Sequence, residues 1–133
     1  MSGIYVRVRV TGEQYALPVG GVLEVAERGE ITPVPGAPPE VVGVKNFHGQ
    51  VIPVIDLASR LGLDRDTDAA LIVVAQEGEH QAGLAVDEVL EVGEIPETSN
   101  ETESELLAGA VAIEGSLVGV VDVAAVLGGS VVS

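Results

Sequence analysis

Two histidines are the residues of this chain best suited to acid–base or metal chemistry, because an imidazole titrates near neutral pH and binds metals. His48 lies in the segment Phe47-His48-Gly49-Gln50, and His80 follows Gly78 and Glu79. Both segments are typical of exposed hairpin turns. Neither histidine belongs to a recognisable motif of serine, histidine and carboxylate residues. The sequence therefore favours a non-catalytic protein with no cofactor and no metal over a small hydrolase or a metal-binding protein.

Two aspartates could also carry chemistry, but their setting predicts a structural role. Asp56 precedes the short segment 57–62 and Asp122 precedes the segment 123–128, and each segment ends in glycine. An aspartate directly before a helix and a glycine directly after it are typical N-cap and C-cap residues. We therefore expect two short helical turns with capping aspartates.

These aspartates belong to an internal repeat. Five residues recur 66 positions later (109 − 43), namely Gly43, Gly49, Asp56, Leu61 and Gly62 as Gly109, Gly115, Asp122, Leu127 and Gly128. The segment 17–25 matches 84–92 with a shift of 67 (84 − 17). Gly49 and Gly115 lie in tight turns that need a positive φ. Small apolar repeats cover each other's hydrophobic faces, so we expect a single domain over 1–133 with halves of roughly 1–66 and 67–133.

Alternating apolar and polar residues predict an all-β fold of about ten short strands. The clearest runs are 6–10, 14–19, 22–26, 51–55, 71–75, 81–86, 89–92, 110–113 and 117–121. The proline-rich segment 33–39 predicts a stiff loop that crosses from one sheet to the next. A short helix is expected at 103–108.

The charge of the chain restricts its partners. Twenty-one acidic and six basic residues give a formal charge of −15, which repels phosphate backbones and anionic lipids. We therefore expect no nucleic acid partner and no direct membrane insertion. There is no cysteine, and no apolar run reaches the roughly 18 residues of a spanning helix. The composition predicts a soluble cytoplasmic protein with a solvated acidic surface, while a dedicated acidic docking face and a salt-rich cytoplasm stay open as alternatives.

The order and spacing of several segments resemble the CheW family of chemotaxis coupling proteins. These segments are 15–19, 22–25, 31–35, 43–44, 46–49 and 51–57, continued in the second half by 83–87 and Gly109. The resemblance implies two pseudo-symmetric, interlocked five-stranded β-barrels. It also implies a non-catalytic adaptor that links the cytoplasmic tip of a chemoreceptor to the regulatory domain of a CheA-type histidine kinase, at membrane receptor arrays.

The resemblance further implies which positions meet partners. They are Val22, Glu24, Val25, Asn46, His48, Val89 and Val92. Val22 and Val25 stand three apart on one strand, so they should face opposite sides of the sheet with one of them exposed; for all these valines, core packing is the alternative to partner contact.

The chain departs from the family at His48. The family commonly carries an arginine there, expected to pair with the glutamate at Glu24. A titratable imidazole replaces a permanent cation. This departure supports one alternative, a diverged regulator that binds only kinase or receptor. Another alternative is a coupling protein of a motility or developmental pathway, because arrays of that kind use the same module.

Overall fold

Ten strands and three short helical segments make up the computed structural model, which describes residues 3–64, 69–96 and 104–130. The strands are β1 (Ile4–Val10), β2 (Glu13–Pro18), β3 (Val22–Glu27), β4 (Val41–Phe47), β5 (Gln50–Asp56), β6 (Leu71–Glu77), β7 (His80–Val86), β8 (Glu88–Glu94), β9 (Leu107–Ile113) and β10 (Ser116–Val121). The helical segments are η1 (Val19–Gly21), α1 (Leu57–Arg60) and α2 (Val123–Ser130). The all-β prediction is confirmed, and every predicted run lies in a strand except Val19, which begins η1.

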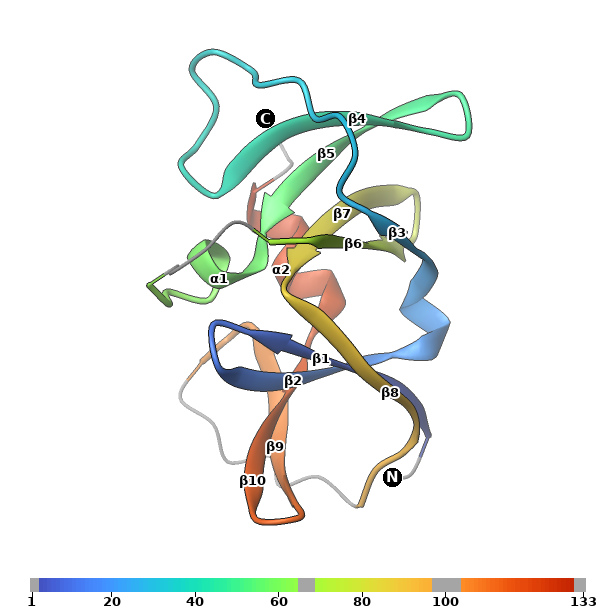
Figure 1. The fold of residues 1–133 in the computed structure, drawn as a ribbon, viewed down its shortest axis with the longest axis vertical. Helices are drawn as coiled ribbons and strands as arrows, with labels where there is room; N and C mark the ends of the chain where they lie inside the picture. Colours follow the sequence, from blue (N-terminus) through green and yellow to red (C-terminus); the bar gives the residue numbers. More distant parts are fainter. Residues whose placement is uncertain (1–2, 65–68, 97–103, 131–133) are drawn as a thin grey trace.

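The strands form two five-stranded sheets of the same design (Figure 1). Sheet A has the order β8-β1-β2-β10-β9, and sheet B has the order β3-β6-β7-β5-β4. The repeat relates the strands β1 to β5 to the strands β6 to β10, in that order. When each strand of sheet A is replaced by its equivalent in the other half, the order of sheet B results. Each sheet contains strands from both halves of the chain, so the halves are interlocked.

The register of the strands follows the repeat as well. In sheet B Gly43 lies opposite Val54, and in sheet A Gly109 lies opposite Val120. Both pairs belong to antiparallel hairpins, and both sheets also contain one parallel pair, β5 with β7 and β10 with β2. The sequence repeat is therefore a structural repeat, down to individual pairs of residues.

Closed barrels are not formed, which corrects one expectation. In the described chain, the edge strands β3 and β4 of sheet B do not pair with each other, nor do β8 and β9 of sheet A. Sheet B curls far enough that Thr32 and Val44 exchange two backbone hydrogen bonds of 2.9 and 2.8 Å. A Cβ on Gly43 would collide with the Thr32 carbonyl, so this approach requires glycine. The proline-rich loop therefore joins two edges of one sheet and does not cross between sheets.

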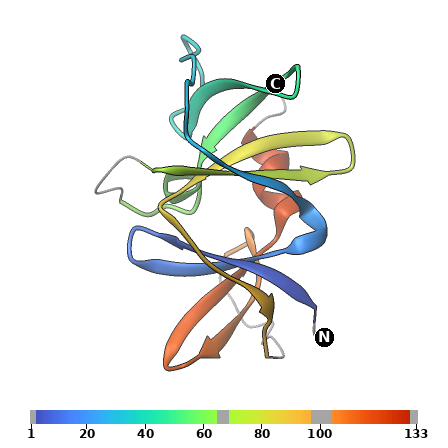
Figure 2. The ribbon, with the colours of Figure 1, turned by 45° about the vertical axis from the view of Figure 1, so that its right-hand side comes forward.

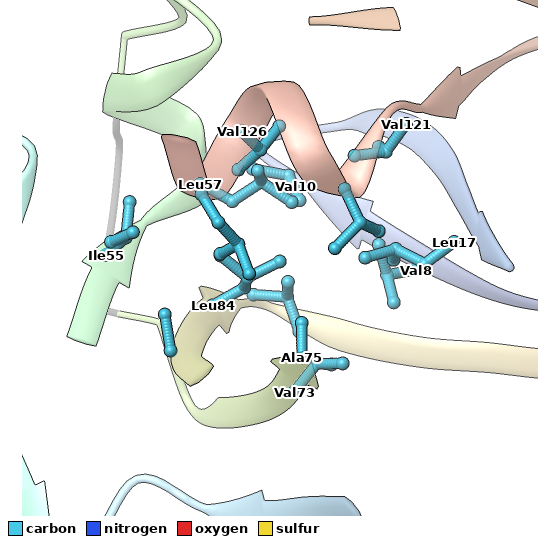
Figure 3. Close-up of a cluster of buried hydrophobic side chains, with 14 of the residues drawn as sticks. Val8, Val10, Leu17, Ile55, Leu57, Val73, Ala75, Leu84, Val121 and Val126 are labelled. Carbon is cyan, nitrogen blue, oxygen red and sulfur yellow. The ribbon is translucent and has the colours of Figure 1, made fainter. Parts of the chain in front are cut away.

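The largest hydrophobic cluster lies between the two sheets. Figure 3 shows side chains from both sheets and from the two helices directed toward one another, including Val8, Leu17, Leu57, Val73 and Val126. Each sheet also has one smaller hydrophobic cluster of its own. The cluster of sheet B includes Ile72, and the cluster of sheet A includes Val118. Burial of branched aliphatic side chains thus holds the sheets together.

The ends of the two helices confirm one expectation and correct another. After α1, Gly62 has a φ of 80°, its N–H donates to Ser59 O, and Leu63 N–H donates to Ala58 O, the pattern of a Schellman cap. The helix α2 instead runs through Gly128 to Ser130, so Gly128 is not a C-cap.

The helix expected at 103–108 is not found in the described part of that range. Ser104 to Leu106 form a turn and β9 begins at Leu107, while Glu103 lies outside the described residues. The alternating burial of β9, which buries Gly109 and Val111, outweighs the helix propensity of the preceding glutamates.

Candidate functional site

Glu24 and His48 meet across the two edges of sheet B. The His48 Nε2 and Glu24 Oε1 atoms are 3.0 Å apart, and the side chains are 72% and 43% exposed. Glu24 lies on β3, and His48 lies in the turn between β4 and β5. We call this pair the hairpin clasp. It ties the tip of the β4–β5 hairpin to the edge strand β3.

The backbone of the hairpin turn explains how His48 reaches Glu24. His48 has a φ of 50° and Gly49 a φ of 82°, so both turn residues lie in the left-handed region, as in a type I′ hairpin. The exposed Asn46 accepts a hydrogen bond of 3.1 Å from the Gly49 N–H through its Oδ1 atom. Asn46 therefore stabilises the turn that presents His48. His80, at the start of β7, is exposed as expected.

Val22 and Val25 lie on the same face of sheet B, which contradicts the expectation of opposite faces. An extra residue, Leu23, forms a bulge, so that Val22 pairs with Ala75 and Val25 pairs with Val73. Ala75 and Val73 both belong to the cluster between the sheets. The expected difference in exposure is confirmed, because Val22 packs on this cluster whereas Val25 is 41% exposed.

Val89 and Val92 repeat this arrangement in sheet A. Leu90 is the bulged residue, Val89 pairs with Val8, and Val92 pairs with Val6. Val8 and Val6 belong to the cluster between the sheets. Val89 packs on the cluster and Val92 is 59% exposed. The strands β3 and β8 lie on the same side of the molecule in Figure 2.

The four valines Val22, Val25, Val89 and Val92 therefore form what we call the valine strip. It begins at the core between the sheets and ends at exposed side chains on two edge strands. An exposed valine on an unpaired sheet edge, two residues beyond a bulge and in line with a core valine, is a candidate docking position for an apolar partner segment.

A cavity of about 690 Å³ lies beside the start of β3. We call it the η1 pocket, and its lining comprises Tyr5, Pro18, Gly20, Gly21, Leu23, Gln76, Glu77, Gly78, Ala108, Val120, Val121, Asp122, Val123 and Ala124. Sequence reasoning missed this pocket and its exposed Leu23. The repeat does indicate that this place is unusual, because Gly20-Gly21 stands where the other half has Asp87-Glu88, at the shift of 67 (87 − 20).

The two capping aspartates differ in their contacts. Asp122 Oδ1 accepts a hydrogen bond of 3.1 Å from the Ala125 N–H, which satisfies one free donor at the start of α2. Asp56 occupies the N-cap position of α1, but its side chain makes no cap hydrogen bond to the backbone of that helix, and its Oδ2 accepts a hydrogen bond of 2.8 Å from the Ser59 hydroxyl. The predicted cap is therefore confirmed for Asp122, whereas Asp56 holds the start of α1 through a side chain.

The basic residues in the described part of the chain are all engaged by oxygen atoms of the protein. Arg7 pairs with Glu91 at 3.3 Å and Arg9 pairs with Glu88 at 2.7 Å. The other three donate to backbone carbonyls, Arg28 to Ala69, Lys45 to Arg28, and Arg60 to Ala125 and Val126. The described surface therefore carries many carboxylates and few available cations.

Three further properties of the described ranges concern metals, membranes and titration. Within these ranges, no group of three or more histidine, cysteine or carboxylate residues could hold a metal ion. Their helices are all too short or too polar to span a bilayer. Burial, and then the nearby Glu13 carboxylate, raise the pKa of Tyr15 above its ordinary value.

Comparisons with known proteins agree with this architecture. Residues 5–130 match the model of the CheW-like domain. The chain is 31% identical over 124 residues to the Chemotaxis protein CheW of Rhizobium meliloti (strain 1021), covering 86% of this chain and 80% of the relative. It is 36% identical over 90 residues to Protein FrzA of Myxococcus xanthus, covering 66% and 56%.

A solved structure shares the fold. The crystal structure of the scaffolding protein TtCheW from Thermoanaerobacter tengcongensis matches with a TM-score of 0.83 and 27% identity, over 92% of this chain and 85% of that one. The paired sheets, the repeated bulges and these matches lead to one conclusion. The chain belongs to the CheW family of non-catalytic scaffold and coupling proteins of chemotaxis.

Proposed function

We propose that this chain binds two partners, the cytoplasmic tip of a chemoreceptor and the regulatory domain of a CheA-type histidine kinase, and thereby couples one to the other in the cytoplasm at a receptor array. The observation that carries the receptor contact is the valine strip. Val25 and Val92 are exposed at equivalent positions of the two halves, and both continue the core between the sheets. An apolar helical hairpin could extend that core across both edge strands.

The hairpin clasp flanks the valine strip, because Glu24 stands next to Val25 on β3. Asn46, His48 and Glu24 are exposed polar groups at one edge of sheet B. They can donate and accept hydrogen bonds at the rim of an apolar contact, which favours a particular orientation of the partner. The interlocked strands support treatment of residues 1–133 as a single domain, in which both contacts keep a fixed relative position.

The receptor contact can be tested with single substitutions in the valine strip. Val25→Asp and Val92→Asp should each weaken binding of a receptor tip fragment, taken from the genome that encodes this chain, by about tenfold or more, since a carboxylate would be buried without a partner. Binding is measured by isothermal titration calorimetry. The free energy of unfolding should change by less than about 0.5 kcal/mol, because both positions are exposed.

Val34→Asp is the matched control, since Val34 is 43% exposed but lies in the loop after β3, outside the valine strip. It should bind the receptor fragment like the wild type. Binding of the kinase regulatory domain should survive the strip substitutions. Receptor binding that is unchanged in both strip variants would show that the receptor contact lies elsewhere.

A second candidate function rests on the similarity to Protein FrzA, a relative whose name does not refer to chemotaxis. It is the same coupling role in another sensory pathway. Receptor and kinase genes encoded next to this chain would distinguish the two, because the partners define the pathway.

A further inference from the structure

The η1 pocket is bordered by a pair of glycines, Gly20-Gly21, where the other half of the repeat has a pair of acidic residues. In the other half the segment Asp87-Glu88 is filled with polar contacts, as Asp87 Oδ2 accepts the Thr11 N–H at 2.7 Å and Glu88 pairs with Arg9 at 2.7 Å. At the equivalent place Gly20-Gly21 carries no side chain, and a Cβ on Gly20 would have no atom within 4 Å. The border of the pocket at Gly20-Gly21 is thus one place where the two copies of the repeat differ.

The lining of the η1 pocket combines apolar walls with two carboxylates. Leu23, Pro18 and Val123 supply apolar surface, and Glu77 and Asp122 supply the acidic groups. Glu77 is exposed and Asp122 is half-buried. Such a lining disfavours an anion and suits a ligand that has an aliphatic stem and a cationic head.

No basic side chain in the described ranges forms an ion pair with either carboxylate. The basic residues of those ranges already donate to other oxygen atoms, and the whole chain has a formal charge of −15. Among the described residues, then, no side chain supplies the cation that would complement Glu77 and Asp122, and a partner molecule can supply it.

The η1 pocket is continuous with the surface assigned to the receptor. Leu23 is the bulged residue of β3 between Val22 and Glu24. The lining residues Val121 and Val123 also belong to the cluster on which the valine strip packs. A partner seated on the strip would therefore extend into the η1 pocket.

We propose that the η1 pocket receives a lysine or arginine side chain that the chemoreceptor tip carries next to its apolar contact residues. This inference rests on the proposed receptor contact and adds the chemistry of the residue that flanks it. The aliphatic stem packs against Leu23, Pro18 and Val123, and the charged head faces Glu77 and Asp122. The pocket volume of about 690 Å³ is larger than the volume of one side chain. Neighbouring residues of the receptor tip therefore enter the pocket together with the basic residue.

The charge requirement is tested with the double variant Glu77→Gln/Asp122→Asn, in which the introduced asparagine can still cap α2. Glu13→Gln/Glu30→Gln removes the same number of charges at exposed positions outside the pocket and is the control. Binding of the receptor tip fragment should weaken about three- to tenfold in the pocket variant and less than about twofold in the control, since the pocket pair is closer to the cation. Titration at two salt concentrations should show a smaller salt dependence for the pocket variant.

The shape requirement is tested with Gly20→Leu, because Gly20 lines the η1 pocket and a Cβ there meets no atom within 4 Å. Receptor binding should fall about tenfold or more, because the side chain occupies the space of the ligand, while kinase binding and the unfolding transition remain those of the wild type. In the reverse experiment, the basic residue of the receptor fragment that lies next to its apolar contacts is replaced by methionine, and this should reproduce the loss.

Three outcomes would overturn the proposal, and the first two leave the proposed function intact. Receptor binding that is unchanged in the Gly20→Leu and charge variants leaves the receptor contact intact and removes the pocket from it. Binding of a free amine such as arginine methyl ester to the pocket by NMR, with no competition from the receptor fragment, would make the occupant a small molecule. A wild-type chain that binds no receptor fragment at all would contradict both proposals.

Discussion

The same glutamate of the repeat has different partners in the two halves of the molecule. Glu24 in sheet B pairs with His48 at the tip of a hairpin, whereas its equivalent Glu91 in sheet A pairs with Arg7 on the neighbouring strand. The position that matches His48 is Glu114 (48 + 66), which has the same left-handed backbone, with a φ of 48°. Two glutamates cannot form an ion pair, so the hairpin clasp is confined to sheet B.

This difference shows how a duplicated fold can acquire two unlike surfaces. The turn backbone, the bulges and the strand order are shared, and a few side chains decide whether a hairpin tip is tied to an edge strand. The β4–β5 hairpin is held by the clasp and by the backbone bridge at Thr32, whereas Glu91 holds the edge strand β8 to β1. We therefore expect substitutions to affect the two sheets unequally.

The largest effect should follow from breaking the backbone bridge of sheet B. Gly43→Ala places a Cβ against the Thr32 carbonyl, and the backbone must shift, at a cost of about 3 kcal/mol or more by the usual size of severe packing defects. Urea unfolding measures this loss. The control is Gly93→Ala in β8, where a Cβ meets no atom within 4 Å, and this variant should lose less than about 1 kcal/mol. Equal losses would indicate that the bridge contributes little.

An intermediate effect is expected from the ion pair of sheet A. The Arg7 side chain is only 16% exposed, so Arg7→Ala should cost about 1 to 2 kcal/mol through lost packing and the lost pair. Glu91→Gln retains the stem of Arg7 and should cost less than about 1 kcal/mol. Comparison of the two by thermal unfolding separates packing from charge. If the two costs are the same, packing of the arginine stem is unimportant.

The smallest effect on stability should come from the hairpin clasp, which is exposed. His48→Arg installs a permanent cation beside Glu24 and should change the free energy of unfolding by less than about 0.5 kcal/mol. Chemical unfolding measures this change. A change of about 1 kcal/mol or more would show that the exposed clasp contributes more to stability than a surface pair does.

The sequence alone predicted the repeat, the strands and the turn glycines, because these depend on local patterns. Gly49 and Gly115 both have a φ of 82°, as tight turns require. The alternation of apolar residues predicted where the strands lie, but it wrongly predicted that Val22 and Val25 face opposite sides of the sheet. The bulge at Leu23 inserts one residue into the period of two, and nothing in the local pattern distinguishes a bulged leucine from a paired one.

Long-range features of the candidate site also escaped prediction. The strand β4 was not among the predicted runs, because Gly43, Lys45 and Asn46 interrupt its apolar pattern. The η1 pocket depends on the approach of β6, β10 and α2 to Gly20-Gly21, and no local pattern reports such an approach. The resemblance to the family predicted which positions to examine, whereas the exposure of Val25 and Val92 required the folded chain.

The interlocking of the strands has a consequence for the origin of this fold. Each half of the chain supplies its first two strands to one sheet and its next three to the other. A chain of half this length could build both sheets only by exchanging strands with a second copy of itself. The ancestor of the duplicated gene is therefore best pictured as a strand-swapped homodimer, and fusion of its two copies freed each half to diverge on its own.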